Sequence, residues 1–275
     1  MKIGLIGAQN SHSRGFCEAI NKKRPWEDVE IGFVYGADDP AEAERLCEEF
    51  GVFLCGSEEE VIEKSDAVAI TYRKGSMHYS PAMKVLKAKK PLFCDKPFTT
   101  NLAEAEEIAM FAAENDVLLS GGSAIKCSNE SLAKIKESIK PGSTVVVSYA
   151  ADPGSEYDGY WFYGSHSAEI CLELCERNFK SVSAFKNGDA VISSVVYSDK
   201  VCVLSTSPGA YNLTVSVTDK SGTTTITPVL YDPDAAALEF VEMIKSKKAP
   251  RGYEFYVKSV ELTGKIIESF EGAHS

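Results

Sequence analysis

The sequence predicts an α/β protein in which an N-terminal Rossmann doubly wound parallel sheet is followed by an α+β domain with a mostly antiparallel sheet. Two observations favour this fold class. Over the first part of the chain, short apolar runs alternate with amphipathic helical segments. Between residues 180 and 229 almost every segment is strand-like, with turn residues between the runs. We therefore expect two domains, residues 1–122 and residues 123–275.

The first domain begins with an apolar strand at residues 2–7 that ends in a glycine, and residues 13–23 carry apolar groups at helical spacing. A second strand, VEIGFVYGADD, leads into a helix with proline in its first turn and Gly51 at its end. After a short helix in EEEVIEKS, residues 66–72 form a continuous apolar run. Such a run is typical of a parallel strand covered on both faces.

A further helix in HYSPAMKVLKAKK precedes a buried strand in PLFCDKP. Thr100 or Asn101 caps a long amphipathic helix, after which VLLSGG closes the series with a strand. This alternation of strand and helix predicts that ligands bind beyond the carboxyl ends of the strands.

The second domain is expected to begin with a helix in ESLAKIKESIK and a strand in STVVVSYAA. A helix around residues 165–176 precedes five strand-like runs that are separated by NGD, SD, SPG and DKSG. The C-terminal segments return to amphipathic helix, and the last of them can pack back on the first domain. We assign this domain to substrate binding and oligomerisation.

Composition excludes several classes of protein. The 275 residues are 44% hydrophobic and 25% charged, which is typical of a globular chain, and the net charge of -11 disfavours nucleic acid as a partner. We find neither a secretory leader nor an apolar run near the roughly 20 residues that span a bilayer, so we expect a cytoplasmic protein without a membrane partner.

The eight cysteines are scattered, and a site of His166, Cys171 and Cys175 would lack a fourth protein ligand for zinc. We expect no metal.

The segment GLIGAQNSHSRG lies where a dinucleotide fold binds pyrophosphate, between the first strand and the first helix. Gly7 makes the turn, but Gln9 and His12 occupy positions where the G-x-G-x-x-G fingerprint has glycine. Asn10, Ser11 or Ser13 can offer hydrogen bonds instead, and a neutral imidazole at His12 can donate to pyrophosphate. Alternatively, Gly7 only turns the chain.

An acidic residue at the end of the second strand is expected to accept hydrogen bonds from the adenosine ribose. The strand ends in YGADDP, so Asp38 is the better candidate and Asp39 the other. Both could instead cap the following helix. If Asp38 faces the ribose, its charge favours NAD over NADP, so the expected cofactor is NAD or NADP, with NAD favoured.

Four segments together resemble the glucose-fructose oxidoreductase and inositol dehydrogenase family (Gfo/Idh/MocA): GLIGA, DAVAITYRKGSMH, the tripeptide Asp95-Lys96-Pro97, and GSHSAE. The resemblance covers the whole chain and is most specific over residues 66–103. There Tyr72 replaces the proline of the family's TPxxxH pattern, and Asp95 replaces the glutamate of its EKP. The resemblance implies cofactor contacts for Thr71, His78 and Asp95, although His78 could instead cap a helix.

In that family the lysine of EKP lies near the nicotinamide and the substrate hydroxyl, which implies the same for Lys96. A partly desolvated lysine at a strand end can orient a hydroxyl and shift its proton affinity. His166, in GSHSAE, matches the family's catalytic histidine and could act as general base or acid. The alternatives are a solvated lysine and a core or helix-start histidine. We assign substrate contacts to Lys96, Tyr163, His166 and Glu169, although Glu169 could simply cap a helical turn.

The family commonly has an aspartate four residues before that histidine, where this chain has Phe162. An aromatic-rich run around Phe162 suggests stacking against a ring, and Asp158 or Glu169 could replace the lost carboxylate.

We expect an NAD(P)-dependent oxidoreductase for a sugar, polyol or related hydroxy compound that assembles as a dimer or tetramer. One alternative is a catalytically degenerate binding or regulatory protein. Another is a lyase or glycosidase that oxidises its substrate transiently and regenerates the cofactor.

Overall fold

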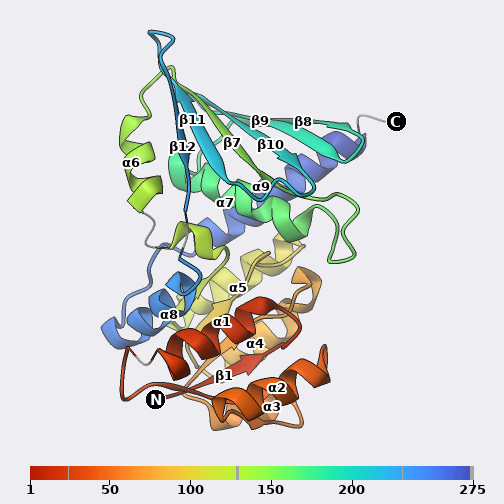
Figure 1. The fold of residues 1–275 in the computed structure, drawn as a ribbon, viewed down its shortest axis with the longest axis vertical. Coiled ribbons are helices and arrows are strands. Elements are labelled where there is room, and N and C mark those ends of the chain that lie inside the picture. The colour runs from red at the N-terminus through yellow and green to blue at the C-terminus, as the bar shows by residue number, and fades with distance from the viewer. Residues whose placement is uncertain (24, 128–129, 231, 273–275) are drawn as a thin grey trace. The chain divides into compact units, whose positions relative to one another are not determined.

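The computed structural model describes residues 1–23, 25–127, 130–230 and 232–272, and Figure 1 shows their course. The chain divides into two units, each of which is built from two segments. Unit 1 comprises Met1–Ala124 and Pro233–Tyr256. Unit 2 comprises Ile125–Asp232 and Val257–Ser275. A segment from near the C-terminus therefore completes the unit that the N-terminal segment begins.

Unit 1 contains a six-stranded parallel sheet, sheet A, with the strand order β3-β2-β1-β4-β5-β6. The order reverses at β1, so the carboxyl ends of β1 and β4 flank the point where doubly wound sheets bind ligands. This parallel sheet confirms the predicted Rossmann fold. The two-residue strand β3 was not predicted, because its side chains are exposed and give no apolar signal. The strands are β1 (Lys2–Ile6), β2 (Glu30–Tyr35), β3 (Phe53–Leu54), β4 (Ala67–Ile70), β5 (Leu92–Cys94) and β6 (Leu119–Gly121).

Polar side chains cap four of the described helices of unit 1, among them α1, which Asn10 caps. Asp39 accepts a hydrogen bond from the N–H of Glu42 at 3.0 Å, and Ser57 and Asn101 cap the following helices in the same way. Asn101, rather than Thr100, is therefore the cap of α5. The first helix continues through a π-helical segment, Glu18–Lys22. The helices are α1 (Ser11–Cys17), α2 (Pro40–Phe50), α3 (Glu58–Lys64), α4 (Tyr79–Lys87), α5 (Leu102–Glu114) and α8 (Ala235–Ser246).

The core of unit 1 joins residues that lie far apart in the sequence. Phe16 of α1 lies 5.0 Å from Phe93 of β5 between ring centroids, and Phe240 of α8 lies 5.8 Å from Phe93. Tyr256 stacks on Phe98 at 5.0 Å. The segment Pro233–Tyr256 is thus part of the hydrophobic core around sheet A, and each buried aromatic ring stabilises it by a few kcal/mol.

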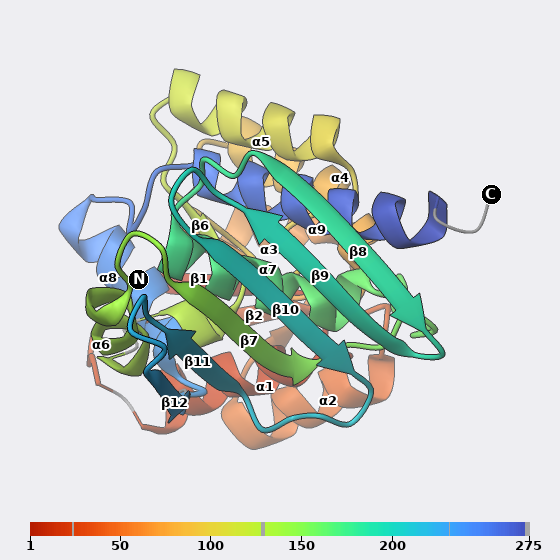
Figure 2. The same ribbon diagram turned by 90° about the horizontal axis from the view of Figure 1, so that it is seen from above.

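Unit 2 contains a second six-stranded sheet, sheet B, with the order β12-β11-β7-β10-β9-β8, and Figure 2 looks onto it. Neighbouring strands are antiparallel except β7 and β10, which are parallel. The predicted mostly antiparallel sheet is therefore confirmed. The strands are β7 (Thr144–Ala150), β8 (Ser181–Asn187), β9 (Ala190–Val196), β10 (Val201–Ser207), β11 (Thr214–Thr218) and β12 (Thr224–Pro228).

Three helices contribute to unit 2: α6 (Glu130–Ser138), α7 (Trp161–Cys175) and the part of α9 (Glu254–Gly272) that begins at Val257. Helix α7 packs on β7 and β10, and α6 packs on α7. Helix α7 begins four residues earlier than the sequence suggested, so Trp161, Phe162 and Tyr163 of the aromatic-rich run belong to its first turn. None of the described helices combines the length and the apolar character needed to cross a bilayer.

One face of sheet B consists entirely of uncharged side chains, although a quarter of the chain is charged. The register aligns them in rows, as where Val203 of β10 lies between Val146 and Ser194. Alternate residues on the other face are buried beneath the helices. The uncharged face comprises Thr144, Val146, Ser148, Ser181, Ser183, Phe185, Ile192, Ser194, Val196, Val201, Val203, Ser205, Thr214, Ser216, Thr218, Thr224, Ile226 and Pro228.

Candidate functional site

The turn after β1 depends on a glycine. Gly7 has φ +107°, and a Cβ atom there would lie 2.6 Å from the backbone nitrogen of Tyr72. Its own N–H donates to the carbonyl of Tyr35 at 2.8 Å, and its carbonyl accepts from the hydroxyl of Thr71 at 2.9 Å. The turn is therefore held between β2 and β4, and only glycine fits there.

The two aspartates at the end of β2 have different roles. Asp39 caps α2, whereas the carboxylate of Asp38 accepts hydrogen bonds from the backbone N–H groups of Ala8 and Gln9, each at 3.0 Å. Gly36 permits this approach, because a Cβ there would lie 2.5 Å from the Cβ of Ala8. The structure thus places a carboxylate beside the turn after β1. The sequence alone gave no reason to single out Gly36.

A buried carboxylate links the same turn to the end of β5. Oδ2 of Asp95 accepts from Nδ2 of Asn10 at 2.8 Å and lies 2.7 Å from Nδ1 of His12. Burial acts to raise the pKa of Asp95, but the charge and hydrogen bond of His12, with the charge of Lys96, hold that pKa below its usual value. Asp95 is therefore an anion at neutral pH. Its other oxygen, Oδ1, is buried and has no partner among the described residues.

The remaining residues of the turn differ in exposure. Asn10 is buried and also caps α1 by accepting from the N–H of His12, whereas Gln9 and Ser11 are exposed. Ser13, another hydrogen-bonding candidate of the turn, uses its hydroxyl to donate to the backbone carbonyls of Ala8 and Asn10. These bonds fix the backbone of the turn and leave Gln9 and Ser11 at its surface.

Thr71 and His78 are fully buried and tie loops together. Nε2 of His78 lies 2.8 Å from the carbonyl oxygen of Tyr72, and Nδ1 lies 3.3 Å from that of Phe98. His78 occupies the residue before α4, but its side chain makes no capping hydrogen bond. The imidazole instead connects the loop after β4 to the segment that follows Lys96.

Lys96 comes directly after Asp95 and is only 3% exposed. The loop after β4 approaches this segment so closely that a Cβ at Gly75 would lie 2.3 Å from Cγ of Pro97. Lys96 is thus a buried cation beside a buried anion, in contrast to the alternative of a solvated loop lysine.

His166 lies on α7 and is 6% exposed. The rings of Tyr149 and Tyr163 pack against its imidazole at centroid distances of 5.7 and 5.2 Å, and Tyr211 packs on Tyr163 at 5.6 Å. Phe162 contacts Tyr163 at 5.0 Å, so an aromatic ring occupies the position where the family commonly has an aspartate. These rings give unit 2 an aromatic cluster around a histidine.

A buried ion pair lies one helical turn beyond His166. Nζ of Lys126 is 2.8 Å from Oε2 of Glu169, and neither side chain is exposed to solvent. Glu169 was predicted as a site residue, but Lys126 was not, because the two residues lie far apart in the chain and no motif surrounds the lysine. Glu169 is held by a cation and does not cap a helix end.

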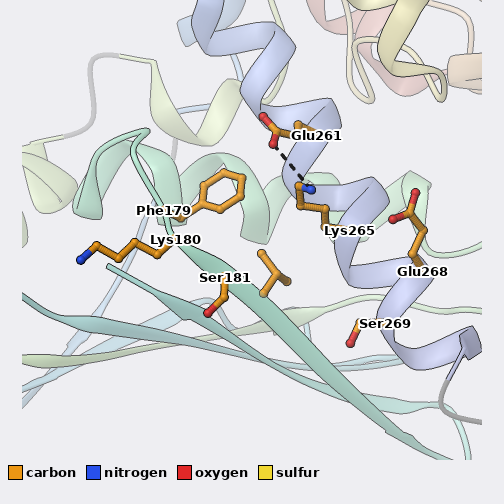
Figure 3. Close-up of a pocket in the computed structure, with 8 residues that line it drawn as sticks. Phe179, Lys180, Ser181, Glu261, Lys265, Glu268 and Ser269 are labelled. Carbon is orange, nitrogen blue, oxygen red and sulfur yellow. Dashed lines mark ion pairs between the residues drawn. The ribbon is translucent and has the colours of Figure 1, made fainter. Parts of the chain in front are cut away.

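The described part of the chain contains no cluster of three or more His, Cys, Asp or Glu side chains suited to a metal ion. An open groove of about 540 Å³ lies between the start of β8 and α9 (Figure 3), and it contains none of the predicted site residues. The predicted residues form two groups instead, one in unit 1 around Gly7, Asp38 and Asp95, the other in unit 2 around His166.

Comparisons with known proteins agree with this fold. Residues 1–123 match the model of the oxidoreductase family with an NAD-binding Rossmann fold, GFO_IDH_MocA. The uncharacterized oxidoreductase YgjR of Escherichia coli is 31% identical over 121 residues, which span 43% of this chain and 35% of that protein. The match therefore covers about a third of the curated relative.

Solved structures match over nearly the whole chain. GenD2 from gentamicin A biosynthesis, in complex with NAD, has a TM-score of 0.82 at 14% identity, covering 99% of this chain and 95% of GenD2. UDP-N-acetylglucosamine 3-dehydrogenase GnnA from Acidithiobacillus ferrooxidans has a TM-score of 0.80 at 16% identity, covering 99% and 98%. An apo scyllo-inositol dehydrogenase from Lactobacillus casei has a TM-score of 0.82 at 14% identity, covering 99% and 96%. At these identities the likeness concerns the fold.

Proposed function

From the match of residues 1–123 to the Gfo/Idh/MocA oxidoreductase family, we propose that the chain is an NAD(P)-dependent oxidoreductase of this family. The observation that carries the proposal is the convergence of the turn at Gly7, the carboxylate of Asp38 and the Asp95-Lys96 segment at the carboxyl ends of β1, β2 and β5. Dinucleotides bind at this edge of such sheets.

The residues at that edge suit a dinucleotide. A Cβ at Gly7 would collide with the backbone of Tyr72, so the turn after β1 needs glycine, and Oδ1 of Asp95 is a buried acceptor without a partner among the described residues. We assign cofactor binding to Gly7, Gln9, Asn10, Ser11, His12, Asp38, Thr71, His78, Asp95 and Lys96. For the buried Thr71 and His78 this role is indirect, since their side chains hold the turn and the loop after β4 in place.

NAD is the favoured cofactor. The carboxylate of Asp38 is fixed beside the turn, where it would repel a 2'-phosphate and can accept from ribose hydroxyls. A bound nicotinamide takes a hydride from a substrate carbon or returns it. GenD2, which has the same fold, was crystallised with NAD, and this supports the choice.

We assign the acid-base chemistry to Lys96 and His166. An ammonium that is nearly excluded from water polarises a substrate hydroxyl more strongly than a solvated one does, because the local dielectric constant is low. His166 takes the hydroxyl proton during oxidation and returns it during reduction. The Lys126–Glu169 pair supplies a second fixed carboxylate on α7, one turn from His166.

The substrate is a sugar, a polyol or a related hydroxy compound. Rings such as Tyr163 stack on the apolar faces of sugars, and His166 and Glu169 supply polar contacts for hydroxyls. The UDP-N-acetylglucosamine and scyllo-inositol dehydrogenases, which share the fold, agree with this class.

We also propose that the chain forms a homo-oligomer through the uncharged face of sheet B. A surface of eighteen residues without a charge would be unusual if exposed, and twofold packing of two such sheets would bury it. A dimer formed in this way, or a pair of such dimers, would match the predicted dimer or tetramer.

A cofactor titration tests the proposed function. NADH and NADPH are added to the wild-type protein and to Gly7→Trp while nicotinamide fluorescence is followed. Micromolar binding to the wild type alone, followed by turnover in a sugar and polyol screen that Lys96→Met and His166→Asn abolish, would support the proposal. Failure of both nucleotides to bind would exclude it. Binding without turnover of any compound would favour a degenerate binding protein, consistent with Phe162 in place of the family aspartate.

A further inference from the structure

The contact between His12 and Asp95 determines which ring nitrogen carries the proton of the neutral imidazole. Nδ1 of His12 lies 2.7 Å from Oδ2 of Asp95, which is 1% exposed. Because the pKa of Asp95 is held below its usual value, its carboxylate is ionised and can only accept. Nδ1 must therefore carry a hydrogen. In the neutral ring Nε2 is then left with a lone pair and cannot donate.

Protonation reverses the character of Nε2. In the imidazolium form both ring nitrogens donate, so Nδ1 keeps its bond to Asp95 while Nε2 offers a charge-assisted donor. The side chain of His12 is 31% exposed, which leaves it accessible to solvent protons and to a ligand. A neutral ring whose Nδ1–H is engaged by Asp95 has no hydrogen at Nε2 to donate to pyrophosphate, unlike the neutral imidazole donor that the sequence suggested.

We propose that His12 is a proton-dependent phosphate-binding residue, which holds a pyrophosphate oxygen through Nε2 only as the imidazolium ion. The proposal rests on the dinucleotide-binding function proposed above. His12 occupies a position where the fingerprint has glycine, so a side-chain cation would replace the close approach of the backbone. Dinucleotide binding should accordingly take up a proton and weaken as the pH rises and the imidazolium ion is lost.

The neighbouring charges support this assignment. Asp95 and Lys96 lie at the end of β5, and Asp38 at the end of β2 accepts from the backbone of the turn. On α1 itself, Arg14 is paired with Glu42 and Glu49 of α2. Arg14 is thus already engaged by two carboxylates, whereas the imidazole of His12 is a side chain that can gain or lose a charge.

The first test concerns the tautomer and needs no cofactor. Long-range proton–nitrogen NMR spectra of the labelled protein are recorded under alkaline conditions in which the imidazole is neutral, and the His12 signals are assigned by their loss in His12→Asn. We expect the Nδ1-protonated form in the wild type. A predominantly Nε2-protonated ring would overturn the proposal before any ligand is added.

The second test measures NADH dissociation constants by fluorescence from pH 6 to pH 9, a range in which the phosphates of NADH do not titrate. The wild-type Kd should rise roughly tenfold, the value of one charge-assisted hydrogen bond. The Kd of His12→Asn should change less than about twofold. Calorimetry in buffers of different ionisation enthalpy should detect proton uptake by the wild type and none by the variant.

The outcomes separate the two proposals. If NADH binds the wild type with a Kd that does not vary with pH, or if His12→Asn keeps the same slope, the role of His12 is excluded while the dinucleotide site stands. If neither NADH nor NADPH binds at any pH, the proposed function fails, and the role of His12 fails with it.

Discussion

The ammonium of Lys126 lies 2.8 Å from the carboxylate of Glu169, and both side chains are fully buried. Glu169 is on α7, three residues after His166, and Lys126 ends a short 3-10 turn, Ala124–Lys126. Each charge has lost its hydration and is stabilised by the other, so removal of one partner leaves an uncompensated buried charge.

Lys126→Met should therefore destabilise the protein by about 3–5 kcal/mol in urea unfolding. The double variant Lys126→Met/Glu169→Leu should regain most of this loss, because it removes both charges. Lys134→Met is the matched control, since Lys134 pairs with Glu130 at 3.9 Å on an exposed surface and should cost less than about 1 kcal/mol. Equal effects of the two single substitutions would contradict a buried pair.

Gly7→Ala and Gly15→Ala should have opposite effects. At Gly7 the new Cβ would overlap the backbone of Tyr72, so we expect a loss of a few kcal/mol and weaker NADH binding. At Gly15, inside α1, a Cβ meets no atom within 4 Å and should stabilise the helix by up to about 1 kcal/mol. Thermal unfolding and a cofactor titration of both variants check this. A tolerated alanine at position 7 would contradict the restricted turn.

Asp38→Asn should change cofactor preference, whereas Asp39→Asn should not. Loss of the Asp38 charge beside the turn should improve NADPH binding relative to NADH by roughly tenfold. Asp39 only caps α2, and asparagine caps equally well, so both stability and preference should be retained. The ratio of the two dissociation constants is the measurement. An unchanged ratio in Asp38→Asn would exclude Asp38 as the discriminating residue.

Asp95 should make the free energy of unfolding decrease as the pH falls into the acidic range. Its pKa is lower in the folded protein than in the unfolded chain, so its stabilising contribution is complete above the ordinary aspartate pKa of about 4. The contribution is lost as the pH falls through the lower folded value. Urea unfolding between pH 7 and pH 3 should show a steeper acid loss for the wild type than for Asp95→Asn. If the stability of the wild type and of Asp95→Asn fell in parallel with pH, Asp95 would have the same pKa in the folded protein and in the unfolded chain, contrary to this prediction.

A charge on the uncharged face of sheet B should disrupt assembly. Val203 lies at its centre, between Val146 and Ser194, so Val203→Glu should convert the oligomer to monomers in sedimentation velocity. Met110→Glu on α5 is the control, because Met110 is 57% exposed in unit 1 and should leave the mass unchanged. A wild-type protein that is monomeric at micromolar concentration would refute the proposed interface directly.

Local signals in the sequence predicted most of the elements. The proline at the start of α2 and Gly51 at its end marked that helix, and the continuous apolar run ending at Ile70 marked β4. Predictions were less accurate where the signal was mixed. The predicted start of α7 was four residues too late, because the first turn of this helix is aromatic and gives a weak helical signal. The short strand β3 was missed because its side chains are exposed.

The sequence by itself determined the succession of strands and helices, and with it the position of Gly7, Asp38, Thr71 and Asp95 at strand ends, because periodicity, caps and turns are local properties. Only the tertiary structure decided which of these residues meet. The pairing of His12 with Asp95 and of Lys126 with Glu169, and the addition of Phe240 to the core of unit 1, join distant parts of the chain. Such contacts depend on how sheets and helices pack, and no local pattern records them.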